Sequence, residues 1–554
     1  MDFAKQIQTL LKEKGVAQPT LEVPPDYAMG DFALPCFLLA KELKKSPQQI
    51  ASELAAGIHA EFLERVEAKG PYVNFFVRPS ILAKTVLTAI SQQQFWEFGK
   101  QQRRVLIEYP SPNTNKPLHL GHVRNLVLGS TLARLLLRDG ATVIQVNLTN
   151  DRGVHICKSM LAYKLFGNNA EPREKSDHFV GEYYVRFQKE VEKDPTLEQQ
   201  AQAMLVDWEN GDPSTIALWM KMNAWALAGQ QETYQRYGIS FDKEYFESEI
   251  YQEGKKIILE HKEKFLQDET GAIIAPLAKY KLPDKVLLRK DGTSIYITQD
   301  IALTIQKMKE FNPDLQIWVV GNEQNLHFAQ LFAILDLMGV KGKESFYHLS
   351  YGMVSLPDGK MKSREGRVVD ADDILTELEV MAAQEIAKRH DDWDEERIRT
   401  TAKSVAMGAI RFFMNKYDPA GDFVFDPKSS LSFEGDTGPY LQYTHARICS
   451  ILAKHKLAAN PDVSLLCMSE EQEVIRQLRK APALYNKAVI ELKPHHLAVQ
   501  LLEIARAFNG FYHACPVLSA EPSVRDARLQ LLDATRSVLS EGLNLLGIDA
   551  PMEM

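Results

Sequence analysis

The sequence predicts an α/β protein. It has a doubly wound parallel (Rossmann-type) catalytic sheet with an insertion, an N-terminal α+β module and a C-terminal all-α helical bundle. Three observations support this prediction. An apolar strand at 105–109 is followed by a helix and a second strand, which makes a βαβ unit. Strand-like segments return at 316–320 and 347–354 after a long charge-mixed stretch. From about residue 372 the pattern is helical to the end.

Composition bounds the class of protein. A chain of 554 residues, with 45% hydrophobic and 25% charged residues, is expected to form two to four globular domains. Its five cysteines are scattered and form no CxxC pair, which argues against a disulfide framework and a cysteine zinc site. No signal peptide and no uncharged apolar run long enough for a membrane span is recognised, so we expect a cytoplasmic protein. The net charge of −8 excludes a generally basic nucleic-acid binder but leaves local basic patches open.

The N-terminal module, residues 1–95, opens with a helical pattern and ends near a strand at 71–77. A lysine-rich helix lies between them, around Lys41, Lys44 and Lys45. These lysines suit phosphate contacts, although a solvated helix face explains any single one equally well.

The catalytic part, residues 96–371, contains the βαβ unit. Its helix is predicted over 123–138 and ends at Asp139-Gly140, and its second strand covers 142–148. A helical stretch over 155–270 indicates an insertion, at about 155–280. Because an insertion between the two halves of such a sheet leaves the crevice at the strands' carboxyl ends open, we expect the ligand there.

The helical remainder is divided into a connector, residues 372–430, and a bundle, residues 431–554. Cations alternate with apolar residues over 397–416 and again suit phosphate contacts, with a solvated helix face as the alternative.

The segment His119-Leu120-Gly121-His122 opens the first helix of the βαβ unit. A helix start attracts phosphate, and histidines there can donate hydrogen bonds as charge builds on phosphorus. Gly121 has no Cβ, so that a flat adenine can approach the backbone. A partial zinc site is the alternative, but zinc proteases space their pair one residue wider and no third ligand is evident. The other alternative is that these four residues occur together by chance.

A second loop, Lys360-Met361-Lys362-Ser363-Arg364, follows the turn at 357–359. Flexible cations can follow the charge of a leaving pyrophosphate. Alone, this segment is better explained as a solvated surface loop; together with the histidines it favours ATP cleavage between the α- and β-phosphates.

Taken together, these motifs resemble those of the class I aminoacyl-tRNA synthetases, with His119-Leu120-Gly121-His122 as the HIGH motif and residues 360–364 as a degenerate KMSKS loop. Within that class the chain closely resembles the arginyl-tRNA synthetase family over essentially its whole length. The specific segments are Glu108 to Asn113, Lys116 to His119, Tyr296 to Asp300, Gly321 to His327, Tyr440 to Arg447 and Gly547 to Met554.

One departure concerns the second lysine of the KMSKS loop, whose usual position is taken by Ser363. In arginyl enzymes a lysine just before HIGH is thought to compensate, and Lys116 matches it. Lys362, one position early, is a rival for that role.

The resemblance also implies a set of site residues. ATP is expected to bind His119, Gly121, His122, Lys116, Lys360, Met361, Lys362 and Ser363, with His119, His122, Lys116 and Lys360 as the catalytic group. Arginine is expected to bind Glu108, Ser111, Asn113, Tyr296, Asp300 and Gln324, and no protein-bound metal is implied.

Physical reasoning supports the two acids in this set. A guanidinium presents five donors in a planar fork and needs acceptors around it, and Glu108 and Asp300 are anions in the two halves of the sheet. Tyr296, four residues before Asp300, can share its helix face. A helix N-cap is the alternative for Asp300, and core packing is the alternative for Tyr296.

The implied activity is ligation of L-arginine to tRNA(Arg) through an arginyl-adenylate, with ATP and Mg²⁺ as cofactors, a monomeric state, no membrane partner and tRNA required for the first step. Three other functions stay open: a small-molecule nucleotidyltransferase, a silent tRNA-binding paralogue and a class I lysyl enzyme.

Overall fold

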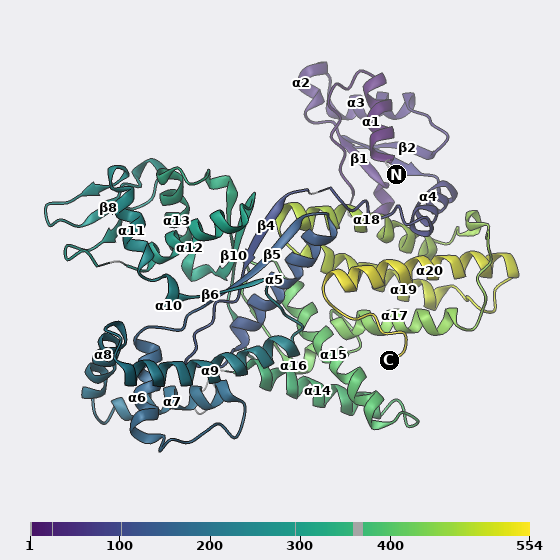
Figure 1. Cartoon of the computed structure of the whole chain (residues 1–554). Helices are drawn as coiled ribbons and strands as arrows, with labels where there is room; N and C mark the ends of the chain where they lie inside the picture. Colours follow the sequence, from purple (N-terminus) through teal and green to yellow (C-terminus); the bar gives the residue numbers. More distant parts are fainter. Residues whose placement is uncertain (1–2, 25, 101, 294, 358–368) are drawn as a thin grey trace.

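We describe the protein from a computed structural model, which covers residues 3–24, 26–100, 102–293, 295–357 and 369–554 (Figure 1). A five-stranded parallel sheet lies at its centre in the order β11-β10-β4-β5-β6. These strands are β4 (Arg104–Glu108), β5 (Thr142–Thr149), β6 (Lys243–Phe246), β10 (Leu315–Gly321) and β11 (Phe346–Tyr351). The chain winds outward from β4 in one direction and returns to β10 on its other side, so the topological switch point lies between β4 and β10. The predicted α/β fold class is confirmed.

Helices cover both faces of this sheet. The side chains of β4 alternate between them: Val105 and Ile107 belong to the core that includes α5 (Leu120–Arg138), and Leu106 packs with Leu303 of α12 (Tyr296–Phe311). The helix α13 (Asn325–Met338) follows β10. The end of α5 is as predicted, since Asp139 is its C-cap and Gly140 has a φ of +97°.

The stretch predicted as a helical insertion contains four helices with a core of their own. They are α6 (Val154–Phe166), α7 (Ser176–Val191), α8 (Thr196–Glu209) and α9 (Pro213–Arg236). The expectation of helix as far as residue 270 is wrong, because β6 pairs with β5 in the central sheet. A second, antiparallel sheet follows, beside α10 (Glu247–Ile250) and α11 (Glu253–Glu260), and its strands are β7 (Leu266–Gln267), β8 (Ile273–Ala275) and β9 (Lys285–Leu288).

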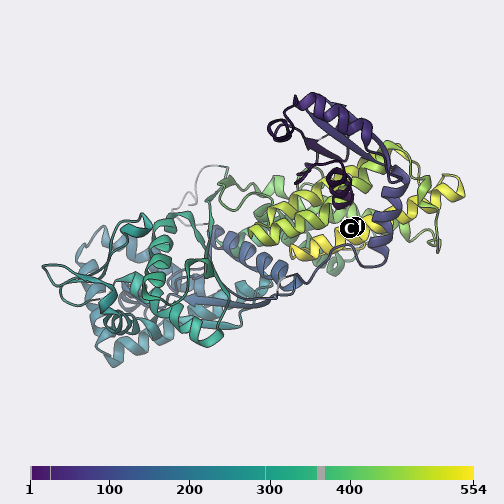
Figure 2. The same cartoon turned by 90° about the horizontal axis from the view of Figure 1, so that it is seen from above.

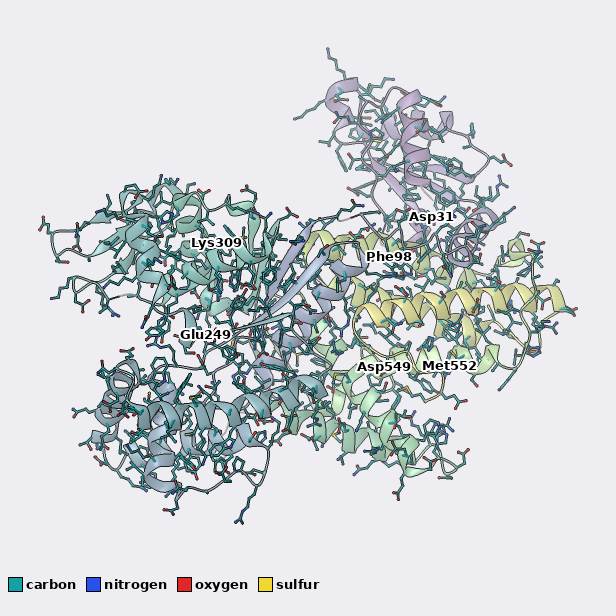
Figure 3. The ribbon with its side chains drawn as sticks, viewed as in Figure 1. Asp31, Phe98, Glu249, Lys309, Asp549 and Met552 are labelled. Carbon is teal, nitrogen blue, oxygen red and sulfur yellow. The ribbon has the colours of Figure 1, made fainter. Side chains whose placement is uncertain are left out.

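The N-terminal module is α+β, as expected, and its sheet has three antiparallel strands; the expected lysine-rich helix includes Lys41 but ends before Lys44, its C-cap. Its elements are α1 (Phe3–Glu13), β1 (Phe32–Pro35), α2 (Leu39–Leu43), α3 (Pro47–Gly57), β2 (Leu63–Lys69), β3 (Tyr72–Val77) and α4 (Pro79–Ser91). It sits over the helical end of the molecule (Figure 2). Asp31, labelled in Figure 3, is 1% exposed and lies 3.0 Å from Nε of Arg476 in α18.

The remaining chain is helical. Its main helices are α14 (Ala371–Ala387), α15 (Glu395–Asn415), α17 (Gly438–Leu452), α18 (Ser469–Glu491), α19 (His495–Ala514) and α20 (Pro522–Leu545), and the short elements are β12 (Val354–Ser355), β13 (Phe423–Val424) and α16 (Pro427–Ser430). One of the cations predicted to contact phosphate, Arg411, is only 2% exposed and donates to the carbonyl of Tyr237. Both interpretations of that residue, phosphate contact and solvated face, are therefore wrong. In the described part of the chain, no helix is long and apolar enough to cross a membrane.

Candidate active site

Two histidine rings lie together where α5 begins, a few residues after β4 ends. His119 is the N-cap of α5, His122 lies in its first turn, and their ring centroids are 3.9 Å apart. This position is beside the carboxyl ends of parallel strands and at the start of a helix, where free N–H groups favour phosphate.

Backbone hydrogen bonds determine which nitrogen of each ring carries the proton. The N–H of Gly121 donates to Nδ1 of His119, and the N–H of His119 donates to Nδ1 of His122, both at 3.1 Å. A neutral imidazole whose Nδ1 accepts carries its hydrogen on Nε2. Burial is the main cause that lowers the pKa of His119 to about 4 and the pKa of His122 well below its usual value. Both rings are therefore neutral Nε2–H donors at pH 7.

Lys116 is half-buried three residues before His119, and burial lowers its pKa. Its charge acts on both histidines, whose pKa values it helps to lower. The other predicted ATP-binding residues, Lys360, Met361, Lys362 and Ser363, lie outside the described residues.

Glu108, the last residue of β4, is only 5% exposed and is not an open acid in the crevice. Its Oε2 forms an ion pair with Nζ of Lys307, a residue of α12 whose side chain is completely buried. Each charge compensates the other for the loss of water. The pair occupies Oε2, and Oε1 is the oxygen that remains to accept a hydrogen bond from an amino acid. Sequence reasoning missed Lys307, although it lies two helical turns after Asp300.

Tyr296 and Asp300 both lie in the first turns of α12, one turn apart, as predicted. The N-cap of that helix is Ile295, so the alternative of a cap for Asp300 is wrong. Tyr296 is 75% exposed, so the packing alternative is wrong as well. Oδ2 of Asp300 lies 2.6 Å from Nε2 of His327 in α13. Gln324 is exposed at the end of β10, in a short 3-10 helix (Asn322–Gln324).

Ser111 and Asn113 lie in the turn between β4 and α5, and they contact β5 or Asn150, the residue that follows it. The N–H of Ser111 donates to Oδ1 of Asn147 at 3.2 Å, and its carbonyl accepts from Nδ2 of Asn150 at 3.1 Å. Asn113 is exposed and forms a β-bridge with Asn150. These contacts therefore hold both predicted residues beside the carboxyl ends of β4 and β5.

Two further carboxylates, those of Asp151 and Glu247, were missed by sequence reasoning; Glu247 lies close enough to Asp151 and to Asp300 for its charge to interact with theirs. The pKa of Glu247 is raised to about 7, mainly by burial; Arg152 lowers it, and the charges of Asp151 and Asp300 contribute to the rise. Ser248 donates to Asp151 through its backbone N–H at 2.9 Å and its hydroxyl at 2.6 Å. A signal existed, since each acid closely follows the carboxyl end of a strand, but β6 was not recognised.

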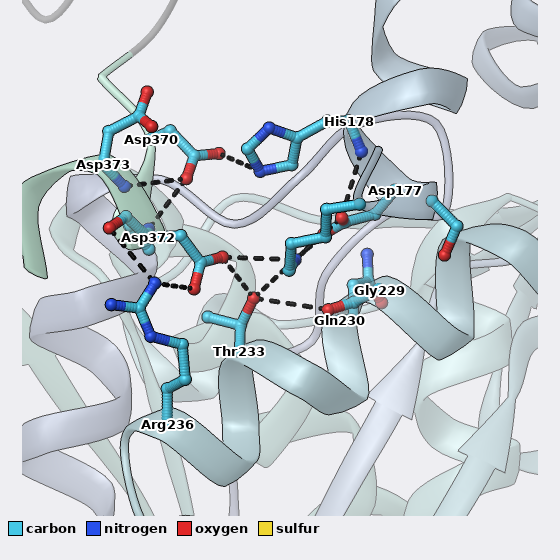
Figure 4. Close-up of polar contacts among 12 residues, drawn as sticks. Asp177, His178, Gly229, Gln230, Thr233, Arg236, Asp370, Asp372 and Asp373 are labelled. Atoms are coloured by element: carbon cyan, nitrogen blue, oxygen red, sulfur yellow. Dashed lines mark hydrogen bonds and ion pairs between the residues drawn. The ribbon is translucent and has the colours of Figure 1, made fainter. Parts of the chain in front are cut away.

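One group of described residues, His178, Asp370 and Asp372, is close enough to hold a cation (Figure 4). Asp372 is already 3.1 Å from Nζ of Lys175 and 3.0 Å from Nη1 of Arg236, and Asp370 is 3.3 Å from Nε2 of His178. These cations neutralise the carboxylates, so the group does not fit a resident metal ion.

A pocket of about 820 Å³ lies between α14, α17 and α19 in the helical region. Aromatic and cationic side chains line it, among them Tyr440, Tyr443, Phe433, Arg389 and Arg447. The guanidinium of Arg447 lies 4.7 Å from the ring of Tyr443. Such a mixture suits bases that stack and phosphates that pair, as in single-stranded nucleic acid.

Three family models match the chain. The catalytic domain of class I (R) tRNA synthetases matches residues 85–427, the arginyl tRNA synthetase N-terminal domain matches residues 2–77, and the DALR anticodon binding domain matches residues 441–554. Together they account for most of the chain.

Relatives and solved structures agree with these models. The arginine–tRNA ligase of Treponema denticola is 44% identical over 553 residues, covering 96% of this chain and 94% of its own, and that of Bacteroides thetaiotaomicron is 40% identical at 95% and 94%. The arginyl-tRNA synthetase structure of Thermus thermophilus matches 99% of both chains with a TM-score of 0.82 and 30% identity. That of Plasmodium falciparum, at 19% identity and a TM-score of 0.79, shows the fold alone.

Proposed function

This chain belongs to the class I arginyl-tRNA synthetases, enzymes that join L-arginine to tRNA with ATP, and we propose which of its side chains perform the reaction. The arginine carboxylate attacks the α-phosphorus of ATP, which gives arginyl-adenylate and pyrophosphate. The 2′-hydroxyl of the terminal adenosine of tRNA then attacks the carbonyl carbon and AMP leaves. Because the carboxylate is already ionised, the first step needs no general base and depends on positioning and charge stabilisation.

ATP is assigned to the start of α5. His119 and His122 donate through Nε2 to phosphate oxygens as negative charge shifts from the α-phosphorus to the leaving pyrophosphate. Lys116 provides a positive charge beside them, Gly121 leaves room for adenine, and Lys360 with Met361, Lys362 and Ser363 is proposed to complete the triphosphate site. Mg²⁺ is proposed to enter with ATP and to neutralise phosphate charge.

Arginine is assigned to the crevice between β4 and β10. Asp300 and Glu247 face the guanidinium, with Tyr296 and Gln324 at the mouth; Glu108, Ser111 and Asn113 are assigned to the ammonium and carboxylate end. The observation that supports this best is the grouping of Asp151, Glu247 and Asp300: the charges of the other two raise the pKa of Glu247 although Arg152 lies 3.8 Å from it, and several carboxylates around one site suit a delocalised cation. A lysyl enzyme would need to surround a compact ammonium instead.

tRNA(Arg) is assigned to the 820 Å³ pocket of the helical domain and to the lysines Lys41, Lys44 and Lys45, of which Lys45 also forms an ion pair with Glu53 at 2.6 Å. The monomeric state, the cytoplasmic location and the domain limits at residues 95, 371 and 430 stay predictions.

The test is exchange of labelled pyrophosphate into ATP with each amino acid, with and without a tRNA(Arg) transcript. Exchange with arginine alone among the amino acids, and only when tRNA is present, is expected. Exchange with lysine instead would overturn the arginine site, and no exchange by folded protein that binds tRNA would indicate the silent paralogue.

A further inference from the structure

The described chain resumes at Val369, directly beside the histidines of α5. The N–H of Leu120 donates to the carbonyl of Val369 at 3.1 Å, and the N–H of Ala371 donates to that of Leu118 at 3.0 Å. Between these bonds His119 and Asp370 form an antiparallel β-bridge. The backbone of His119 is therefore held in place by the residue that begins α14.

Asp370 uses its two oxygens in different ways. Oδ1 accepts from the N–H groups of Asp372 at 2.7 Å and Asp373 at 3.3 Å, which caps α14. Oδ2 lies 3.3 Å from Nε2 of His178 in α7. Both of these atoms are buried and, among the described residues, have no hydrogen-bond partner, so their ion pair is the contact that compensates them.

A denser network anchors α7 and α9 next to this pair (Figure 4). Nζ of Lys175 lies 2.7 Å from Asp177 and 3.1 Å from Asp372, and the hydroxyl of Thr233 donates to Asp372 at 2.7 Å. Gly229 allows the helices to approach, because a Cβ there would lie 2.3 Å from Oδ1 of Asp177. His178 is thus presented to Asp370 from a rigid support.

We propose that His178 is a positioning residue for ATP activation: by holding Asp370, it fixes the backbone of His119 and with it the orientation of the phosphate-binding imidazole. This role rests on the function proposed for His119. The contact with Asp370 is the largest cause that raises the pKa of His178 above the ordinary histidine value, which favours the charged imidazolium and so strengthens the ion pair. The helix α7 of the insertion thereby supports the proposed ATP site through Asp370.

The test is steady-state pyrophosphate exchange with saturating tRNA by the full-length variants His178→Ala and His178→Gln. His178→Ala is expected to lower kcat about tenfold or more while the KM for arginine stays unchanged, and His178→Gln, which keeps a donor, is expected to recover much of the loss. The control Glu171→Gln removes an exposed ion pair with Lys221 in the same insertion, 2.7 Å long, and is expected to have no effect.

A double-mutant cycle distinguishes positioning from general destabilisation. In a His119→Ala background, His178→Ala should have no further effect on kcat, because its route to ATP is already removed. The proposal would be overturned if His178→Ala lowered kcat equally in both backgrounds, or if His178→Ala had the wild-type kcat. The proposed function would still stand in either case, provided that the wild-type protein catalyses exchange with arginine. Absence of exchange in the wild type would instead refute that function.

Discussion

Replacing Lys307 by methionine tests the buried ion pair with Glu108, a residue of the proposed arginine site. Methionine fills a similar volume without the charge, so the change leaves Glu108, whose side chain is 6% exposed, without its cation. Removal of one partner of a buried pair costs about 3–5 kcal/mol. We therefore expect a loss of that size in the free energy of unfolding of the catalytic domain, with weaker arginine binding.

The assay is urea unfolding followed by tryptophan fluorescence, since the ring of Trp318 lies 6.0 Å from Nζ of Lys307. The control is Lys307→Met combined with Glu108→Gln, which removes both charges and should recover most of the stability but not arginine activation. If the single and double variants unfold with the same free energy, within about 0.5 kcal/mol, an uncompensated charge is not the cause and the reasoning is refuted.

Three other perturbations follow from the site and the module contacts. His122→Ala should cost about 2–4 kcal/mol of transition-state stabilisation in pyrophosphate exchange, and an unchanged kcat would remove its assigned role. Because the raised pKa of Glu247 is about 7, this carboxylate gains a proton as the pH falls from 8 to 6, and the KM for arginine should rise. Glu247→Gln should raise the KM for arginine about 10- to 100-fold and abolish its dependence on pH. A variant whose pH profile matches that of the wild type would contradict this role. Asp31→Ala leaves Arg476 without its buried partner and should speed tryptic release of the N-terminal module, whereas an unchanged cleavage rate would show that other contacts hold it.

Much of the fold could be predicted because β4, α5 and β5 differ clearly in hydrophobic period, and the histidines mark where the helix begins. The strand β6 could not be predicted from the sequence, because Lys243 to Phe246 is a short segment with two charged residues. Only its pairing with β5 makes it a strand. That pairing is a tertiary contact, which local propensity does not report. Missing β6 also meant missing Glu247, which follows it directly.

Charge patterns failed for a related reason. Lys307 and Arg411 lie in amphipathic helices, where a cation normally indicates a solvated face, yet both are buried. Lys307 meets a carboxylate, and Arg411 meets the carbonyl of Tyr237 and the hydroxyl of Ser130. Sequence spacing shows which residues share a helix face but not what covers it. The sequence therefore indicated acids for the proposed arginine site but not Lys307, the cation that compensates Glu108.

The neutral state of His119 and His122 has a consequence for turnover. Two imidazolium cations would hold the multiply charged pyrophosphate tightly after bond cleavage, whereas neutral N–H donors hold it mainly through geometry. If these rings bind phosphate as proposed, their neutral state favours the reaction while adding less to the affinity for pyrophosphate than two imidazolium cations would.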